Sequence, residues 1–148
     1  MSRESLFSSI VPSLPAEALA KLVSLKAKTI ATGDVYVIPE ALARYWESTK
    51  ARPALVVRVQ RSAIGDPAVA YLVYGTTGRV RGRRRFPVAA GEADLRKDTT
   101  FDLGPWLELP AVELAEKCER IGALSAQGLE KLEPLLATSD LPFRSLPR

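Results

Sequence analysis

The most informative feature for chemistry is an absence, because the chain of 148 residues contains no histidine. Histidine is the commonest metal ligand and the only side chain that titrates near neutral pH without help from its surroundings. The sequence therefore excludes Ser/His/Asp hydrolysis, zinc hydrolysis and ribonuclease chemistry based on a histidine pair. The single cysteine, Cys118, excludes an internal disulfide and a thiolate metal cluster, and we expect it to be a partly buried small residue. We expect no metal and no cofactor, so any catalysis must use Arg, Lys, Thr, Ser, Tyr, Asp or Glu.

Arginine is the side chain that stands out for binding. The formal charge of the whole chain is only +4, yet five arginines lie within seven residues. Such a concentration of cations favours a polyanion. A solvated hairpin tip would have the same composition, but Gly82 permits flexibility and an adjacent aromatic ring could stack on a base, so we favour nucleic-acid contact. The residues assigned to this contact are Arg79, Arg81, Arg83, Arg84, Arg85 and Phe86.

These side chains must be positioned by a series of short elements, beginning with a helix. Residues 13–28 place apolar side chains at helical spacing, with Pro15 in the first turn, and are expected to form an amphipathic arm. Residues 35–38 form a short strand after the turn at Gly33-Asp34. Residues 39–52 mix charged, aromatic and helix-forming residues, which indicates a long loop or a short helix.

The middle of the chain has the pattern of a hairpin. Residues 53–60 form a nearly continuous apolar strand, residues 68–74 form the next one, and Gly65-Asp66-Pro67 between them is a turn signal. We expect Gly75 to interrupt the second strand. Further strands are expected at residues 85–88 and 99–103.

The last third of the chain contains an ambiguous segment and a clear helix. Residues 107–121 suit a helix or a strand, and propensity alone favours helix. The final helix follows Ser125, which can cap it, and Leu124 with Leu129 forms a hydrophobic staple. Its inner face is expected to consist of Leu129, Leu132, Leu135 and Leu136.

This order of elements predicts a mainly β fold with some α (α+β): a small, strongly bent β-barrel with a C-terminal helix and an N-terminal helical arm. An open α+β sheet is the alternative. We divide the chain into an arm at 1–30, a barrel domain at 31–138 and a tail at 139–148. The apolar runs are far shorter than the roughly 18 to 20 residues that cross a bilayer. Because no secretory signal is evident either, a cytoplasmic protein is expected.

Three segments in this order resemble the PemK/MazF family of toxins from type II toxin–antitoxin systems. Residues 33–37, Gly-Asp-Val-Tyr-Val, are similar to the opening strand of the family. Residues 52–57, Arg-Pro-Ala-Leu-Val-Val, match its Arg-Pro-x-Leu-Val-Val strand at every fixed position. Residues 95–99 and 121–125 resemble its Leu-Lys-x-Asp-Ser strand and its Ile-Gly-x-Leu-Ser entry to the last helix. The resemblance covers residues 31–137.

The resemblance implies an SH3-like barrel, a homodimer, cleavage of single-stranded RNA and inhibition by a cognate antitoxin protein. In the family a threonine follows the third strand, and Thr76 falls on that position; Thr77 takes its place if the alignment slips by one residue. The implied catalytic pair is Arg52 with Thr76. From the residues themselves we also expect Tyr45 and Trp46 to contact RNA, together with Thr77, the arginine-rich segment and Phe86, although the abundance of arginine after Thr77 departs from the family pattern.

The chemistry of RNA cleavage is consistent with arginine in this role. Attack by the 2′-hydroxyl places charge on the phosphoryl oxygens, and a guanidinium stays charged and can meet two of these oxygens at once. A threonine hydroxyl can donate or accept a hydrogen bond at the same centre but is a poor base. Arg52 would therefore supply most of the electrostatic stabilisation.

Several assignments have a structural alternative that the sequence leaves open. Tyr45 and Trp46 either stack bases or anchor a long loop. Trp106 is expected in the core or a dimer interface. Asp34 and Asp98 could orient arginines or cap turns, and we favour capping. At the level of function, the alternatives to a ribonuclease are a non-catalytic nucleic-acid-binding module on the same fold and a toxin that poisons DNA gyrase.

Overall fold

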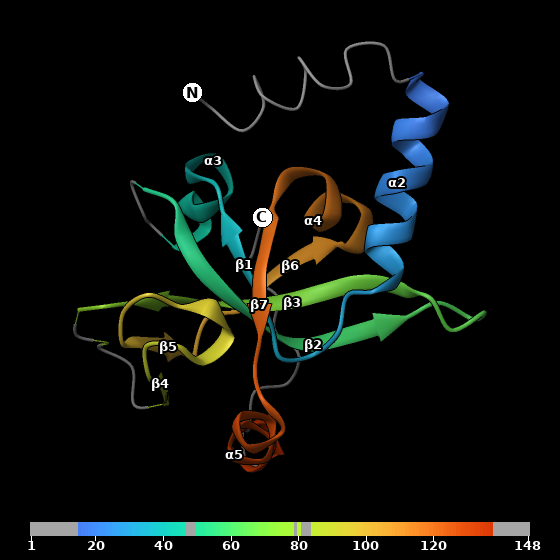
Figure 1. Ribbon diagram of the computed structural model, residues 1–148. Helices are drawn as coiled ribbons and strands as arrows, with labels where there is room; N and C mark the ends of the chain where they lie inside the picture. Colours follow the sequence, from blue (N-terminus) through green and yellow to red (C-terminus); the bar gives the residue numbers. More distant parts are fainter. Residues whose placement is uncertain (1–14, 47–49, 79, 81–83, 138–148) are drawn as a thin grey trace.

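A computed structural model describes residues 15–46, 50–78, 80 and 84–137 of the chain. Within these residues the fold is one strongly bent antiparallel sheet with helices on both faces (Figure 1). The strand order is β4-β5-β3-β2-β1-β7, and β6 pairs with β3 beside this path. The expected fold class, mainly β with a bent, barrel-like sheet and a C-terminal helix, is confirmed.

The N-terminal arm is a helix that begins later than expected. Helix α2 spans Ala16–Lys28, with Pro15 immediately before it, because proline needs no amide partner at a helix start. Its Ala27 is buried against the body of the protein. Three leucines of this helix remain exposed, and they are Leu19, Leu22 and Leu25.

Three short elements follow the arm. Strand β1 spans Asp34–Ile38 and is largely buried. The segment after it contains helix α3 at Glu40–Ala43 and a single 3-10 turn, η1, at Arg44–Trp46. The prediction of a short helix in this connection is therefore correct.

Strands β2 (Arg52–Arg61) and β3 (Pro67–Thr76) form the expected hairpin. The expectation that Gly75 interrupts the second strand is wrong, because β3 continues through it to Thr76. Glycine is required here by packing: a Cβ at this position would lie 2.7 Å from Thr99 and 2.8 Å from Phe101. Because Gly75 has no side chain, β5 can approach β3 closely at this position.

Strand β3 is the centre of the sheet because its second edge is shared by two partners. Its first half pairs with β6 (Leu107–Pro110), and its last residues pair with β5 (Thr99–Asp102). Strand β4 (Arg85–Val88) completes this side by pairing with β5. A 3-10 turn, η2, lies between them at Glu92–Asp94.

The ambiguous segment at 107–121 contains three elements. Strand β6 leads directly into helix α4 (Ala111–Lys117), and β7 (Glu119–Ala123) follows and pairs with β1. The helical prediction from propensity is correct only for the middle of the segment, because strand pairing with distant residues decides its two ends.

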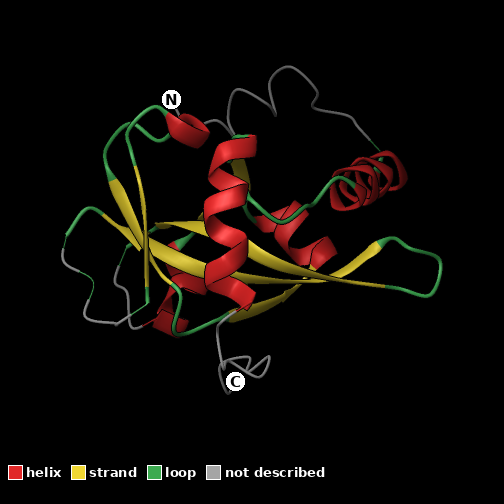
Figure 2. Ribbon diagram, turned by 90° about the horizontal axis from the view of Figure 1, so that it is seen from below, coloured by secondary structure: helices red, strands yellow, loops and turns green. Residues whose placement is uncertain are grey.

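Helix α5 spans Ala126–Ala137 and has the predicted cap, since the backbone amide of Gly128 donates to Ser125 Oγ at 3.1 Å. Leu132 is fully buried, whereas Leu135 is 38% exposed and was wrongly placed on the inner face. Figures 1 and 2 show α5 across one face of the sheet, with α2 and α4 on the other side. The expected tail at 139–148 lies outside the described residues.

The bent sheet separates two apolar cores. The core on one face unites sheet residues such as Val56 and Leu72 with α2 and with Leu114 of α4. The core on the other face unites Val73 and Phe101 with α5 and with the β4–β5 hairpin. Alternate residues of β2 and β3 point to opposite cores, as the twofold period of a strand requires.

Cys118 offers a test of the packing behind α4. Burial, with a smaller contribution from Glu113, raises the pKa of its thiol to about 12, which keeps the thiol protonated at neutral pH. We expect Cys118 in the folded protein to react with a disulfide reagent at pH 8 at least about tenfold more slowly than after unfolding in guanidinium. Equal rates in the two states would contradict the partly buried position of Cys118.

Candidate active site

Arg52 and Thr76 meet at one end of the sheet. Arg52 begins β2 and Thr76 ends β3, and the antiparallel pairing of Ala54 with Tyr74 places them opposite each other. The Arg52 guanidinium donates from Nη1 to Thr76 Oγ1 at 3.4 Å, between residues 24 apart in the sequence. This is long for a hydrogen bond, so the two groups are adjacent without being tightly locked together. Both residues are half-buried.

The threonine hydroxyl is held from a second direction. Its Oγ1 also accepts a hydrogen bond from the backbone amide of Gly78 at 3.1 Å. The turn chemistry seen in the sequence is therefore present, and it fixes the hydroxyl beside the guanidinium. Thr77 is exposed beyond the strand end, so Thr76 is the hydroxyl that the structure brings to Arg52.

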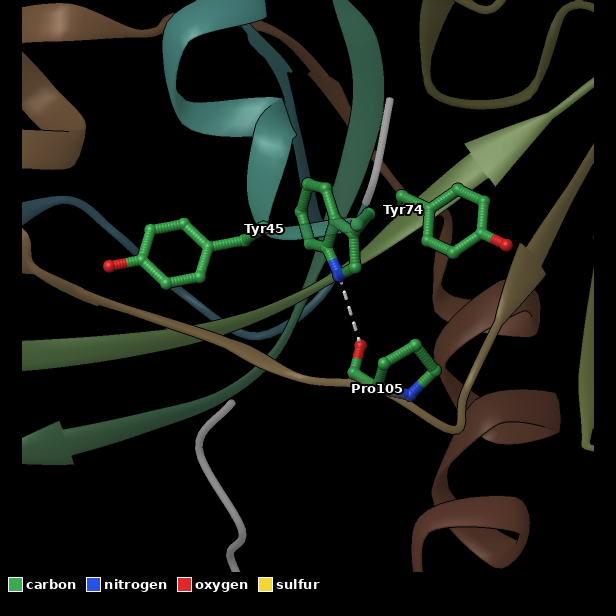
Figure 3. Close-up of a pocket in the computed structure, with 4 residues that line it drawn as sticks. Tyr45, Tyr74 and Pro105 are labelled. Carbon is green, nitrogen blue, oxygen red and sulfur yellow. Dashed lines mark hydrogen bonds between the residues drawn. The ribbon is translucent and has the colours of Figure 1, made fainter. Parts of the chain in front are cut away.

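An aromatic pocket lies next to this pair. It has a volume of about 220 Å³ and is lined by Tyr45, Trp46, Tyr74 and Pro105. The Trp46 indole donates from Nε1 to the Pro105 carbonyl at 3.2 Å, and its ring lies 5.6 Å from that of Tyr74. Figure 3 shows Tyr45 and Tyr74 on opposite sides of the site, with their hydroxyls pointing away from each other.

Tyr74 links the pocket to the pair and was missed in the sequence. It lies two residues before Thr76 on β3, and residues at this spacing share one face of a strand. Its hydroxyl donates to Asp102 Oδ2 at 3.5 Å. An aromatic residue two positions before a candidate catalytic residue in a strand is the signal that could have identified it.

The structure describes only part of the arginine-rich segment. Arg79, Arg81 and Arg83 lie outside the described residues. Arg85 is exposed on β4. Nη1 of Arg84 is buried and has no hydrogen-bond acceptor within the described part of the chain.

The expectation that Phe86 stacks on a base is wrong. Phe86 is 4% exposed and packs in the core beside Phe101. The cause is the alternation along β4, which turns Phe86 and Val88 inward and Arg85 and Pro87 outward. Arg85 therefore remains at the surface of β4 without the Phe86 ring beside it.

The structure confirms a core position for Trp106, and it shows Asp34 and Asp98 accepting hydrogen bonds from loop amides, while Asp34 also contacts an arginine. Trp106 is buried in the core, where Nε1 donates to the Leu103 carbonyl at 2.9 Å. Asp98 accepts from the backbone amide of Ala90 at 2.9 Å. Asp34 accepts from the amide of Ala31 at 3.0 Å and forms an ion pair with Arg120 at 3.4 Å.

No protein-family model and no curated protein matches the chain. The described residues contain no group of three or more potential ligands that could hold a metal ion. No helix in the described ranges is long and apolar enough to cross a membrane.

Proposed function

We propose that this chain is a metal-independent endoribonuclease that cuts single-stranded RNA, and that it acts as the toxin of a type II toxin–antitoxin pair. The observation that carries the proposal is the contact between Arg52 and Thr76 at 3.4 Å. The sequence resemblance names these two residues as a catalytic pair. A cognate antitoxin protein, a second copy of the chain and a cytoplasmic location belong to the same proposal.

The pair suits a reaction in which the RNA supplies its own nucleophile. The 2′-hydroxyl gives its proton to solvent water, and its oxygen forms a bond to phosphorus. The bond from phosphorus to the 5′-oxygen breaks as that oxygen takes up a proton from solvent. The products are a 2′,3′-cyclic phosphate and a free 5′-hydroxyl. The Arg52 guanidinium is the group that would stabilise charge on the phosphoryl oxygens during this step.

Thr76 would orient the reacting groups rather than act as a base. Its oxygen already accepts from Arg52 and from the amide of Gly78, so its own hydroxyl proton is directed away from both donors. A hydroxyl oriented in this way can donate to a phosphoryl oxygen held by the same guanidinium. Catalysis by the pair is therefore electrostatic and positional.

A phosphodiester backbone has cationic surface beside this pair. Thr76 lies opposite Thr100 of β5, and Thr100 lies opposite Pro87 of β4. Arg85, two residues before Pro87, is exposed and lies opposite Asp102. A phosphate beside the cut would meet the Arg85 side chain.

The direct test is incubation of the purified protein with a single-stranded RNA of mixed sequence in EDTA. We expect fragments with a 2′,3′-cyclic phosphate and a 5′-hydroxyl, and little cutting of the same sequence in a perfect duplex. If the protein binds RNA but never cuts it, the chain is an RNA-binding module and not a ribonuclease. Cutting that needs a divalent ion would also reject the proposed mechanism.

The choice between the two threonines leads to a separate prediction. Thr76→Val keeps the shape of the side chain and removes its hydroxyl, so we expect cleavage to slow by about 10- to 100-fold. Thr77→Val removes a hydroxyl one residue further and is expected to change the rate by less than about threefold. Initial rates on one RNA substrate provide the comparison, and the reverse order of effects would assign the role to Thr77.

A further inference from the structure

We infer that the pocket formed by Tyr45, Trp46, Tyr74 and Pro105 is a subsite for one unpaired nucleobase of the RNA strand. The inference rests on the proposed function for its ligand class, but it concerns binding and can be tested without cleavage. It gives a role to Tyr74, a residue outside the catalytic pair. The pocket would hold the base of a nucleotide adjoining the phosphate on Arg52.

The size and lining of the pocket fit a single planar ring system. Its volume of about 220 Å³ is smaller than the roughly 300 to 1,000 Å³ that encloses a drug-sized ligand. Three of its four lining residues are aromatic and the fourth is proline. Bases stack on such rings regardless of sequence, because every base has a π-face.

The geometry also determines how a base can enter. The Trp46 and Tyr74 rings lie 5.6 Å apart at an interplanar angle of 44°, so they are already in contact. A base therefore lies against this pair and not between its members. The Trp46 side of the pocket is preformed, since the Trp46 indole donates a hydrogen bond to the Pro105 carbonyl at 3.2 Å. The Tyr74 hydroxyl lies 3.5 Å from Asp102, which is too long for a strong hydrogen bond.

Position relative to the catalytic pair supports an RNA ligand. Tyr74 and Thr76 are separated by two residues of β3, which corresponds to roughly 7 Å along the strand. A phosphate at Arg52 and a base at Tyr74 can thus belong to the same or neighbouring nucleotides. The Arg52 guanidinium would bind the RNA backbone while the aromatic rings bind the base. Sites that bind single-stranded nucleic acids combine these two kinds of contact.

The subsite would also explain selection of single-stranded substrate. A base in a duplex is paired and stacked on its neighbours, so it cannot turn into a side pocket without breaking those contacts. For an unpaired base in a single strand, turning into the pocket has a much smaller free-energy cost. Preference for unpaired RNA would then arise from the pocket, whereas cleavage would arise from Arg52 and Thr76.

The test measures binding of RNA oligonucleotides that carry a 2′-O-methyl group at every position and therefore cannot be cut. In one series each oligonucleotide lacks a single base. We expect loss of the base at one position to weaken binding to the wild-type protein by about 10- to 100-fold. Tyr74→Leu should weaken binding of the intact oligonucleotide by a similar factor, and the same abasic site should then have little further effect.

Two further variants make the result specific to stacking. Tyr74→Phe retains the ring and should bind within about twofold of the wild type, and Trp46→Leu should behave like Tyr74→Leu. The dependence of affinity on salt should be unchanged in Tyr74→Leu, because no phosphate contact is lost, but should be shallower in Arg85→Ala. Circular dichroism and thermal unfolding verify that each variant is folded; if Tyr74→Leu is not, Trp46→Leu provides the same comparison.

The outcomes separate the two proposals. Equal affinity of wild type, Tyr74→Leu and Trp46→Leu, or the absence of a sensitive base position, would overturn the base subsite while leaving an Arg52-dependent ribonuclease intact. A sensitive position that vanishes in Tyr74→Leu, in a protein that never cuts RNA, would support the subsite and reject the ribonuclease. No binding of RNA at all would overturn both.

Discussion

Replacement of Arg52 by alanine is expected to lower the rate of RNA cleavage by about 100- to 1,000-fold, because it removes the group that stabilises the charged phosphoryl oxygens. Its Nη1 lies 3.4 Å from Oγ1 of Thr76, the other member of the proposed catalytic pair. The half-buried position at the start of β2 makes a large change in stability unexpected. Single-turnover rates with a defined RNA, measured beside circular dichroism spectra, test the effect.

Two control variants sharpen this experiment. Arg52→Lys retains the charge but loses the planar fork, so we expect it to recover only part of the lost rate. Arg61→Ala removes the same side chain from the other end of β2, where Arg61 donates to the Gly65 carbonyl at 3.0 Å. Activity of Arg61→Ala should remain within about twofold of the wild type. Undiminished cleavage by Arg52→Ala would rule out the catalytic assignment.

The second large effect is expected in the fold, at Gly122 of β7. A Cβ at this position would overlap the backbone of Ala93 in η2. That backbone has little freedom to move, since Ala93 and Asp94 both adopt left-handed conformations, with φ of 54° and 57°. Gly122→Ala is therefore expected to lower the free energy of unfolding by about 3 kcal/mol or more. Urea denaturation measures this loss.

Gly65 in the hairpin turn provides the comparison. Its φ of +92° disfavours any other residue, but a Cβ there would meet nothing within 4 Å. Gly65→Ala should thus show the cost of the left-handed conformation alone, about 1 to 2 kcal/mol. A Gly122→Ala variant no less stable than Gly65→Ala would mean that η2 can move away from β7.

Much of the fold could be predicted because its elements carry local signals. The β2–β3 hairpin follows from two apolar runs around a turn, and α5 follows from Ser125 and its leucines. Residues 107–121 could not be resolved in this way, because β6 and β7 are defined by pairing with β3 and β1, far away in the sequence. Gly75 was misjudged for the same reason, since the contact that requires it comes from β5.

The candidate site was predictable where it depends on a linear motif. Arg52 was indicated by a strand motif and Thr76 by its place after the next strand, and antiparallel pairing brings them together. Tyr74 could not be connected with Trp46 from sequence, because three separate segments build the pocket. Phe86 was misassigned because its neighbours are charged, although strand alternation turns it inward.

The spacing of the contacts at this site has a consequence for the order in which it assembles. Arg52 and Thr76 are joined through a hairpin with a short turn, so their approach closes a small loop. The contact between Trp46 and Pro105 spans 59 residues. It joins the β1–β2 connection to the β5–β6 connection, and β2 lies on one edge of β3 while β5 and β6 lie on the other. Closing the longer loop costs more chain entropy and depends on slower, nonlocal pairing. During folding, the contact between Arg52 and Thr76 should therefore form early. The aromatic pocket should be completed only when the whole sheet has formed.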